Sequence, residues 1–456
     1  MYRSILFANI KIVLTGLVIL TSYLFGTLPI LRSAGADTEG SQNTLIQAGE
    51  TIGTPTISKT LLFDPLEGSE LIRFGDLNGD GTSDILLARH KGQKIRLLTA
   101  MTLDGEILWH RGKIQGDHSG VVFSDLAVQI FDINQDGDNE VIVVMGKFLR
   151  VLSGRTGKTL QKVRVTSDAR DSIAFAQLDR GTNPYSIILK NRYSKFWVYS
   201  HRLREQYERT LRTGHYPVEY DIDGDGRDEF LMGYTLFRAN GRPIWRASRI
   251  KRHNDAADIN DVDGDGIPEI AIASSGDSYL LDKDGNTLWK QDHRHSQHAI
   301  ISRLNAGSSG ERQVSFIERP TGNVYTYDKD GSLLWKLSNL GKITMASAVS
   351  GWSDAHDQEF LMIFRMTDNN PSLINGDGHV VAEFPFPLAG TPESGLSKHF
   401  VHHFDIVGDH REEIIIHNEQ GLVVYENSEP ASNLLFIQEA IPNRRMYNST
   451  FYIGSQ

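Results

Sequence analysis

Four short stretches of the chain carry oxygen-bearing side chains at a spacing that suits a divalent cation. Each follows the pattern D-x-[DN]-x-D-G-x-x-[DE] and leads into an apolar run. Side chains at positions 1, 3, 5 and 9 can converge on one ion, together with the carbonyl of position 7, and such ligands suit calcium. The predicted ligands are Asp76, Asn78, Asp80 and Asp84; Asp132, Asn134, Asp136 and Glu140; Asp221, Asp223, Asp225 and Glu229; and Asp261, Asp263, Asp265 and Glu269.

We therefore expect about four calcium ions, with a mainly structural role. The alternative is a set of solvated Asp/Gly turns, but carboxylates crowded this closely repel one another without a cation. An EF-hand is excluded because its bidentate glutamate at position 12 would fall on apolar residues, and because strands rather than helices follow. A fifth copy begins at Asp405, where Val407 occupies the third ligand position, so we expect a plain turn there.

Histidines form the second group of residues that could do chemistry. His215 and His253 lie six and eight residues before a complete acidic turn. Each could be a ligand, a base or a sugar contact, or simply a hydrogen-bonded histidine that fixes the entry of a strand. The runs His293–His298 and Lys398–His403 are further candidates, with polar loops as the alternative. The basic run Arg249–Arg252 is interpreted as a solvated edge that could contact a uronate.

The acidic turns belong to a longer repeat. Weaker copies near residues 179, 304, 352 and 405 complete eight units, spaced by about 40 to 56 residues. In four units an Asp-Gly or Asn-Gly hairpin turn leads to a tryptophan: Trp109, Trp245, Trp289 and Trp335. Short strands joined by such turns at this period are typical of propeller blades. The sequence predicts an all-β fold, a single eight-bladed β-propeller over residues 70–456. Upstream loops of successive blades would then lie on one face, where histidines from several blades could converge near the axis, but the sequence does not decide whether they do.

Composition excludes several classes of function. There are 47 Lys+Arg against 57 Asp+Glu, a net charge of −10, which argues against a nucleic-acid partner. The absence of cysteine rules out disulfides, thiol nucleophiles and cysteine-based metal centres. The four complete turns hold 16 acidic residues, so the acidity indicates ion binding. No hydrolase or phosphate-loop motif is present.

The N-terminal segment resembles an export signal. Residues 12–31 have no charged side chain, cations precede them, and Ala34-Gly35-Ala36 suits a signal-peptidase site. We expect residues 1–36 to be a signal peptide or an N-terminal membrane anchor, and residues 37–69 a linker with a possible closing strand. The propeller is then periplasmic, extracellular or membrane-anchored on the outside, and a monomer is expected.

The acidic turns resemble the FG-GAP or VCBS repeats of integrin-type propellers. Taken in order, further motifs resemble the rhamnogalacturonan lyases of polysaccharide lyase family eleven. Thr213-Gly214-His215 is similar to that family's Gly-Asn-His, and His253–Ala256 to its His-Gly-Asp-Ala. Asp405–Glu413 and the closing Tyr447-Asn448 match two more of its segments, whereas Gly395-Leu396-Ser397 replaces its Asn-Gly-Thr.

This resemblance implies a pectin-like polysaccharide partner and β-elimination at a uronate. Such a reaction needs a base and a nearby cation, and Lys398, His215 and His253 are the residues that the resemblance points to. Two hypotheses remain. The first is a non-catalytic exported propeller that binds polysaccharide or a cell-surface partner. The second is an active rhamnogalacturonan or pectin lyase.

Overall fold

The computed structural model describes residues 52–428, apart from 122–124, 181–183, 306–309, 342–343, 354–357, 366–369, 389–398, 408 and 410. All of these residues belong to one compact unit, Ile46–Gln456. The described residues form β-strands and connections, which agrees with the predicted all-β class. None of them forms a helix long and apolar enough to cross a membrane. The predicted export segment, residues 1–36, lies outside the described part.

The strands are grouped into antiparallel sheets in chain order. One eight-stranded sheet comprises β2 (Ile72–Gly75), β3 (Asp84–Lys91), β4 (Lys94–Met101), β5 (Ile107–Gly112), β6 (Val128–Phe131), β7 (Glu140–Met145), β8 (Phe148–Ser153) and β9 (Thr159–Arg164). The next two sheets are four-stranded: β10 (Ser172–Ala176), β11 (Ser186–Lys190), β12 (Lys195–Tyr199) and β13 (Glu205–Thr210), then β14 (Val218–Tyr220), β15 (Glu229–Met232), β16 (Thr235–Phe237) and β17 (Pro243–Arg246).

Four further groups complete the described unit, and each is again four-stranded. They are β18 (Asn254–Asn260), β19 (Glu269–Ser274), β20 (Ser278–Leu281) and β21 (Thr287–Gln291); β22 (Ser296–Ser302), β23 (Gln313–Glu318), β24 (Asn323–Tyr327) and β25 (Leu333–Leu337); β26 (Thr344–Ser350), β27 (Glu359–Arg365), β28 (Ser372–Ile374) and β29 (Val380–Glu383); and β30 (Phe400–Phe404), β31 (Glu413–Asn418), β32 (Gly421–Asn427) and β1 (Pro55–Leu62). Such four-stranded sheets are consistent with a propeller.

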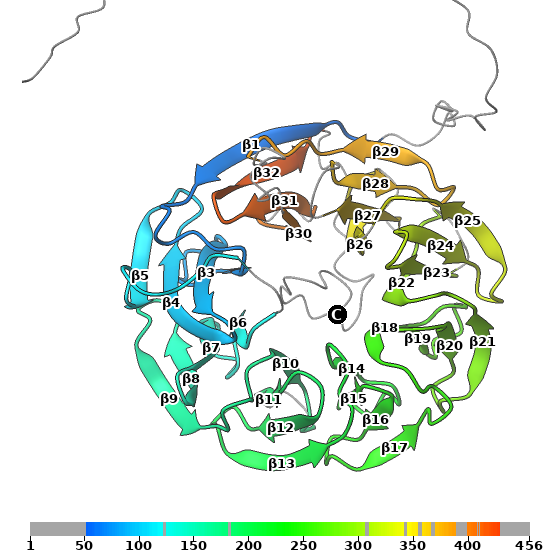
Figure 1. Ribbon diagram of the computed structural model, residues 1–456, viewed down its shortest axis with the longest axis horizontal. Helices are drawn as coiled ribbons and strands as arrows, with labels where there is room; N and C mark the ends of the chain where they lie inside the picture. Colours follow the sequence, from blue (N-terminus) through cyan, green and yellow to red (C-terminus); the bar gives the residue numbers. More distant parts are fainter. Residues whose placement is uncertain are drawn as a thin grey trace, which may run out of the picture. The chain divides into compact units, whose positions relative to one another are not determined.

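Within this unit the sheets succeed one another around a ring, with the first strand of each group innermost (Figure 1). Apolar side chains pack between neighbouring sheets, and one cluster joins Phe74 and Leu87 of the first sheet to Ile415 and Val424 of the last. β1 pairs with β32, so a segment from early in the chain supplies the outer strand of the last sheet. Separating the last sheet from its neighbours would therefore disrupt contacts between segments far apart in the sequence.

Three of the repeated tryptophans connect one sheet to the next, and the fourth, Trp109, links two parts of the eight-stranded sheet. The indole Nε1 of Trp289 donates to the carbonyl of Lys329 at 2.9 Å, and a Cβ added to Gly331 would lie 2.8 Å from the same ring. Gly331 has a φ of +82°, so the turn needs glycine both for its backbone and for the close approach of the indole. Trp109, Trp245 and Trp335 donate in the same way to Gly154, Lys283 and Gly376.

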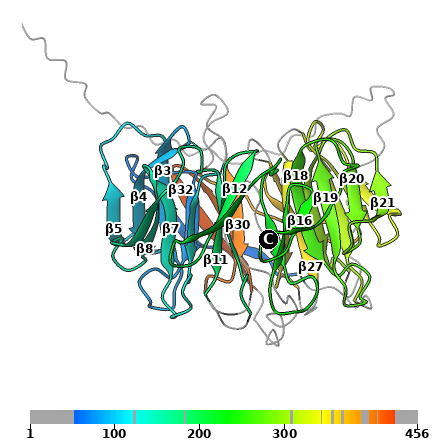
Figure 2. The ribbon, with the colours of Figure 1, turned by 90° about the horizontal axis from the view of Figure 1, so that it is seen from below.

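Antiparallel pairing places the loops of each group at two opposite ends (Figure 2). One end carries the turns between the first and second strands, which include all the acidic turns, and we call it the acidic face. The other end carries the hairpins between second and third strands and the connections to the next group, such as residues 211–217 and 247–253. We call it the histidine face.

Candidate functional site

The four complete acidic turns share one pattern of backbone hydrogen bonds. In the third turn, Asp221 accepts the amides of Asp225 and Gly226 at 3.0 and 2.9 Å. The carboxylate of Glu229 reaches back to accept the amide of Ile222 at 3.2 Å. These bonds hold the side chains at positions 1 and 9 in fixed orientations, since each carboxylate is anchored by the main chain of its own turn.

The same bond from position 2 to the carboxylate at position 9 recurs elsewhere on the acidic face. The amides of Leu77, Ile133, Val262 and Ile406 donate to Asp84, Glu140, Glu269 and Glu413. Among its described residues, the incomplete turn at Asp405 thus shares this bond, and the amide of Asp409 donates to Asp405 as at position 5 of the complete turns. It differs in carrying an exposed Val407 where the others have Asp or Asn.

Two of the turns bring three carboxylates close enough to share an ion. Ligand atoms of Asp221, Asp223 and Asp225 lie within 4.8 Å of one another. The equivalent group, Asp261, Asp263 and Asp265, meets the same limit. Calcium–oxygen distances are about 2.3–2.6 Å, so two ligands on opposite sides of one ion are about 5 Å apart. The donor set and its spacing therefore fit calcium.

The carboxyls at position 9 are the buried members of these turns. Burial raises the pKa of Glu140, Glu229 and Glu269 to about 7, and neighbouring aspartates add to the shift. A carboxylate at this position is costly while it lacks a counter-charge. A divalent cation would supply that charge. Burial raises the pKa of Glu413 to about 7 as well, so the ligand at position 3, and not this shift, distinguishes the complete turns.

The histidine face brings together side chains from several connections. His215 precedes β14, His253 precedes β18 and His295 precedes β22. The rings of His215 and His253 have centroids 4.8 Å apart. Asp255 lies beneath them, with 3.6 Å between its Oδ1 and Nε2 of His215, and 3.5 Å between its Oδ2 and Nε2 of His295. We call these four residues the histidine cluster.

Aromatic and hydroxyl groups border the histidine cluster. Tyr193, from the β11–β12 hairpin, packs edge-on against His253 with centroids 4.4 Å apart and is 37% exposed. Ser275 donates a hydrogen bond to Asp255 at 2.7 Å. The cluster thus combines an accessible aromatic ring with polar groups, a combination common in ligand sites.

Burial controls the charge of the cluster. It lowers the pKa of His215 to about 2, with His253 and nearby cations adding to the shift. The pKa of His253 is also lowered, and that of Asp255 is raised, in both cases chiefly by burial. At neutral pH His215 is therefore a neutral imidazole, which binds protons only weakly and can offer a lone pair to a metal ion.

One cation could bind in the cluster. Ligand atoms of His215, His253 and Asp255 lie within 4.8 Å of one another. Two imidazoles and a carboxylate suit zinc and other transition metals better than calcium, which prefers oxygen ligands throughout. This site differs from the acidic turns in both ligand type and location.

The predicted catalytic residues have different outcomes. His215 and His253 come together as neighbours on one face, although 37 residues separate them in the sequence. Lys398 lies outside the described residues, as do Tyr447 and Asn448. The sequence analysis missed Asp255, Tyr193 and Ser275 as members of this site. The His-x-Asp spacing of His253 and Asp255 was an available signal, because side chains two apart on a strand point the same way.

The other predicted histidine runs are mostly structural. His293 is buried between Ser278 and Tyr327, at 2.6 and 3.0 Å. His403 contacts Ser347 at 2.9 Å and Glu412 at 3.1 Å. Two residues of the run His293–His298 contact Asp255: His295, and Gln297, whose amide donates to Asp255 at 3.4 Å.

No protein-family model matches this chain, and no curated protein matches its sequence. Solved structures do. The chain is 16% identical to the exotype rhamnogalacturonan lyase YesX, covering 83% of this chain and 76% of that one, with a TM-score of 0.60. It is 16% identical to the Bacillus licheniformis rhamnogalacturonan lyase PL11, with coverage of 83% and 76% and a TM-score of 0.58. It is also 14% identical to the V. cholerae biofilm matrix protein Bap1, with coverage of 84% and 92% and a TM-score of 0.57.

These similarities establish the fold alone. Structural neighbours include rhamnogalacturonan lyases, as the sequence resemblance predicted, together with a protein whose described role is in a biofilm matrix. One fold hosts different functions, so function must be argued from the site. The FG-GAP or VCBS assignment of the acidic turns stays a prediction.

Proposed function

We propose that this chain is an exported, calcium-binding eight-bladed β-propeller whose histidine face binds a pectin-like polysaccharide. In the eight-stranded sheet, β2–β5 and β6–β9 are joined by a single parallel bridge, between Ile95 and Met145. We count these as two blades, and the other six sheets bring the total to eight.

Calcium in this proposal stabilises the acidic face. The side chains at positions 1, 3, 5 and 9 of each complete turn hold one ion, and the turn is already shaped by its backbone hydrogen bonds. The copy at Asp405 holds none, because Val407 offers no oxygen. Export agrees with this assignment, since calcium is abundant outside cells and the chain has no cysteine for disulfides.

The observation that carries the polysaccharide assignment is the convergence of His215, His253, His295, Asp255 and Tyr193 at one place. An exposed tyrosine ring can pack on a sugar face, while imidazole nitrogens supply directional hydrogen bonds. Since these groups come from connections that follow one another around the ring, they could contact successive sugar units of one saccharide chain.

A second candidate is a lyase acting at the same place. Burial keeps both His215 and His253 neutral, but a pKa of about 2 makes His215 a weak base, so His253 is the candidate to remove a proton next to a uronate carboxylate. A cation held by the remaining groups of the cluster would stabilise the charge of the developing enolate. The role of Lys398 remains a prediction from the family resemblance.

Binding and cleavage can be separated in one experiment. Rhamnogalacturonan and polygalacturonate are titrated into the protein by calorimetry, while ultraviolet absorbance follows the unsaturated product of elimination. We expect binding with a flat absorbance trace, and at least tenfold weaker binding by the double variant His215→Gln/His253→Gln.

The matched control is His379→Gln, an exposed histidine in the β28–β29 turn on the acidic face. A rise in absorbance that the double variant abolishes would establish the lyase instead. Equal binding by the double variant and the control would refute a saccharide site at the histidine cluster.

A further inference from the structure

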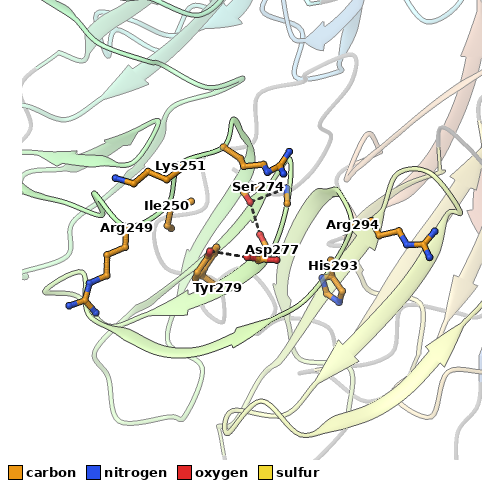
Figure 3. Close-up of a pocket in the computed structure, with 10 residues that line it drawn as sticks. Arg249, Ile250, Lys251, Ser274, Asp277, Tyr279, His293 and Arg294 are labelled. Atoms are coloured by element: carbon orange, nitrogen blue, oxygen red, sulfur yellow. Dashed lines mark hydrogen bonds between the residues drawn. The ribbon is translucent and has the colours of Figure 1, made fainter.

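A pocket of about 440 Å³ lies on the histidine face, beside the histidine cluster (Figure 3). Three loops line it: residues 249–252 before β18, the β19–β20 hairpin at Gly276, and Arg294 before β22. Tyr279 and His293 lie between the flanking cationic loops. The size is that of a small-ligand site.

The rim of the pocket is strongly cationic. Arg249, Lys251, Arg252 and Arg294 carry positive charges, against one acidic residue, Asp277. Asp277 already pairs with Lys290 at 2.9 Å. Within the described part of the chain, the guanidinium groups of Arg249, Arg252 and Arg294 show neither an ion pair nor a hydrogen bond. The pocket therefore has excess positive charge, although the chain has a net charge of −10.

The same three loops border the pocket and the histidine cluster, and neighbouring residues of each loop belong to one site or the other. Arg252 lines the pocket, and the next residue, His253, belongs to the cluster. Likewise, Arg294 lines the pocket and the next residue, His295, belongs to the cluster. In the hairpin between them, Ser275 contacts Asp255 while Gly276 lines the pocket.

Backbone hydrogen bonds hold these three loops together. The amide of Ser275 donates to the carbonyl of His253 at 2.8 Å, and that of Ser296 donates to the carbonyl of Gly276 at 3.3 Å. The two sites are thus built on the same three loops, which these hydrogen bonds fix relative to one another.

We propose that this pocket is a second subsite, which binds an anionic group, a carboxylate or a sulfate, on a saccharide that also contacts the histidine cluster. The assignment rests on the proposed saccharide binding of the histidine face, and it adds the residues that would bind the acidic groups of that saccharide. Guanidinium groups suit both anions because their planar donors pair with two oxygens at once. Tyr279 offers an aromatic surface for the sugar ring, and the exposed rim admits a chain that continues beyond the pocket.

The test compares charge reversal in the pocket with charge reversal elsewhere on the same sheets. The variant Arg249→Glu/Arg294→Glu reverses two unpaired pocket cations. The control Arg242→Glu/Arg246→Glu makes the same change in net charge at two exposed arginines that do not line the pocket. Calorimetry measures binding of oligogalacturonate, a sulfated oligosaccharide and a neutral oligosaccharide of equal length to the full-length protein.

We expect the pocket variant to bind the anionic saccharides about tenfold more weakly, and the control to match the parent protein. Added salt should reduce the difference. Comparing the carboxylated and sulfated ligands identifies which anion the pocket prefers. Equal weakening by both variants would show only a general charge effect and overturn the subsite, and so would unchanged binding by the pocket variant.

A small anion separates failure of this subsite from failure of the proposed function. Sodium sulfate and monomeric galacturonate are titrated at constant ionic strength, and chemical shifts or melting temperature are followed. Saturable binding that only the pocket variant loses supports the anion site, even if no polysaccharide binds the cluster. If neither anion binds saturably and no anionic saccharide depends on Arg249 and Arg294, the subsite is wrong.

Discussion

The acidic face and the histidine face build their sites in different ways. On the acidic face, each candidate cation site lies inside one turn of nine residues and is shaped by hydrogen bonds within that turn. On the histidine face, the cluster draws on three connections, each belonging to a different pair of sheets. The acidic turns therefore recur from sheet to sheet, whereas the histidine cluster forms only where particular sheets are neighbours.

The two faces should consequently differ in what they contribute. Sites repeated around the ring suit stabilisation, because each ties its own pair of strands. A single cluster with partly accessible groups suits recognition of a ligand. The following four predictions separate these roles, and they begin with the largest expected effect.

Removal of calcium should have the largest effect on stability. At one hundred times the dissociation constant, each bound ion adds about 2.7 kcal/mol to the free energy of unfolding. For four sites in a unit of this size, excess EDTA should lower the melting temperature by about 10 °C or more. Differential scanning calorimetry with and without calcium measures this shift. An unchanged melting curve would leave the acidic face as solvated turns only.

Two glutamates at equivalent positions should respond differently to substitution. Glu229 and Glu413 each accept an amide, from Ile222 and Ile406, but only the turn of Glu229 has a complete ligand set. In calcium, Glu229→Gln should lower the free energy of unfolding by about 2–3 kcal/mol, the contribution of one ion. Glu413→Gln is the matched control and should cost less than about 0.5 kcal/mol.

Urea unfolding in calcium and in EDTA measures both variants. The difference between them should vanish in EDTA. A difference that persists without calcium would mean that Glu229 acts through packing rather than through an ion.

Two buried histidines, His298 in β22 and His417 in β31, should make the free energy of unfolding fall in acid. Burial lowers the pKa of His298 and His417 to about 3 each. The unfolded chain takes up these protons near pH 6.5, before the folded chain does. Stability is therefore complete above about pH 6.5 and is lost as the pH falls toward 3, by up to about 1.4 kcal/mol per pH unit for each histidine.

The free energy of unfolding between pH 7 and pH 4.5 tests this slope. His417→Gln should reduce the slope of this free energy against pH by the contribution of one proton. His379→Gln, at an exposed site, should leave the slope unchanged. Parallel curves for the parent and His417→Gln would contradict the assignment.

The smallest effect is expected at a link between two acidic turns. Arg155 bonds to Asp138 at 2.9 Å and to the carbonyl of Asn78, so it joins the second turn to the first. Its side chain is about half exposed. Arg155→Ala should cost less than about 1 kcal/mol, and less still in high salt. A larger loss by urea unfolding would show that the turns act as a connected network.

Much of the architecture could be predicted from the sequence because its signals are local. The Asp-Gly turns, the apolar strands and the tryptophan positions each lie within about ten residues, and the structure places them as all-β sheets in chain order. Trp245, Trp289 and Trp335 each bond to the following sheet. In two of the turns, three carboxylates also lie within 4.8 Å of one another, while the calcium assignment stays a prediction.

The histidine face was harder to predict. His215 and His253 were chosen from motif resemblance, but Asp255 and Tyr193 were not: Asp255 offered only its His-x-Asp spacing from His253, and no local pattern marked Tyr193. The run Arg249–Arg252 was interpreted as a solvated edge, and the structure places it on the wall of a pocket. Residues that meet in space from separate sheets have no characteristic spacing in the sequence, so their contact could not be predicted from it.

The sequence by itself determined the repeat, the strand pattern and the ligand types in each acidic turn, since these depend on backbone turns and side chains that are close along the chain. Only the tertiary structure decided that β1 pairs with β32, that the histidine cluster forms, and that four cations gather around one pocket. These features depend on how the sheets are ordered and packed around the ring. Their energy comes from contacts between residues distant in sequence.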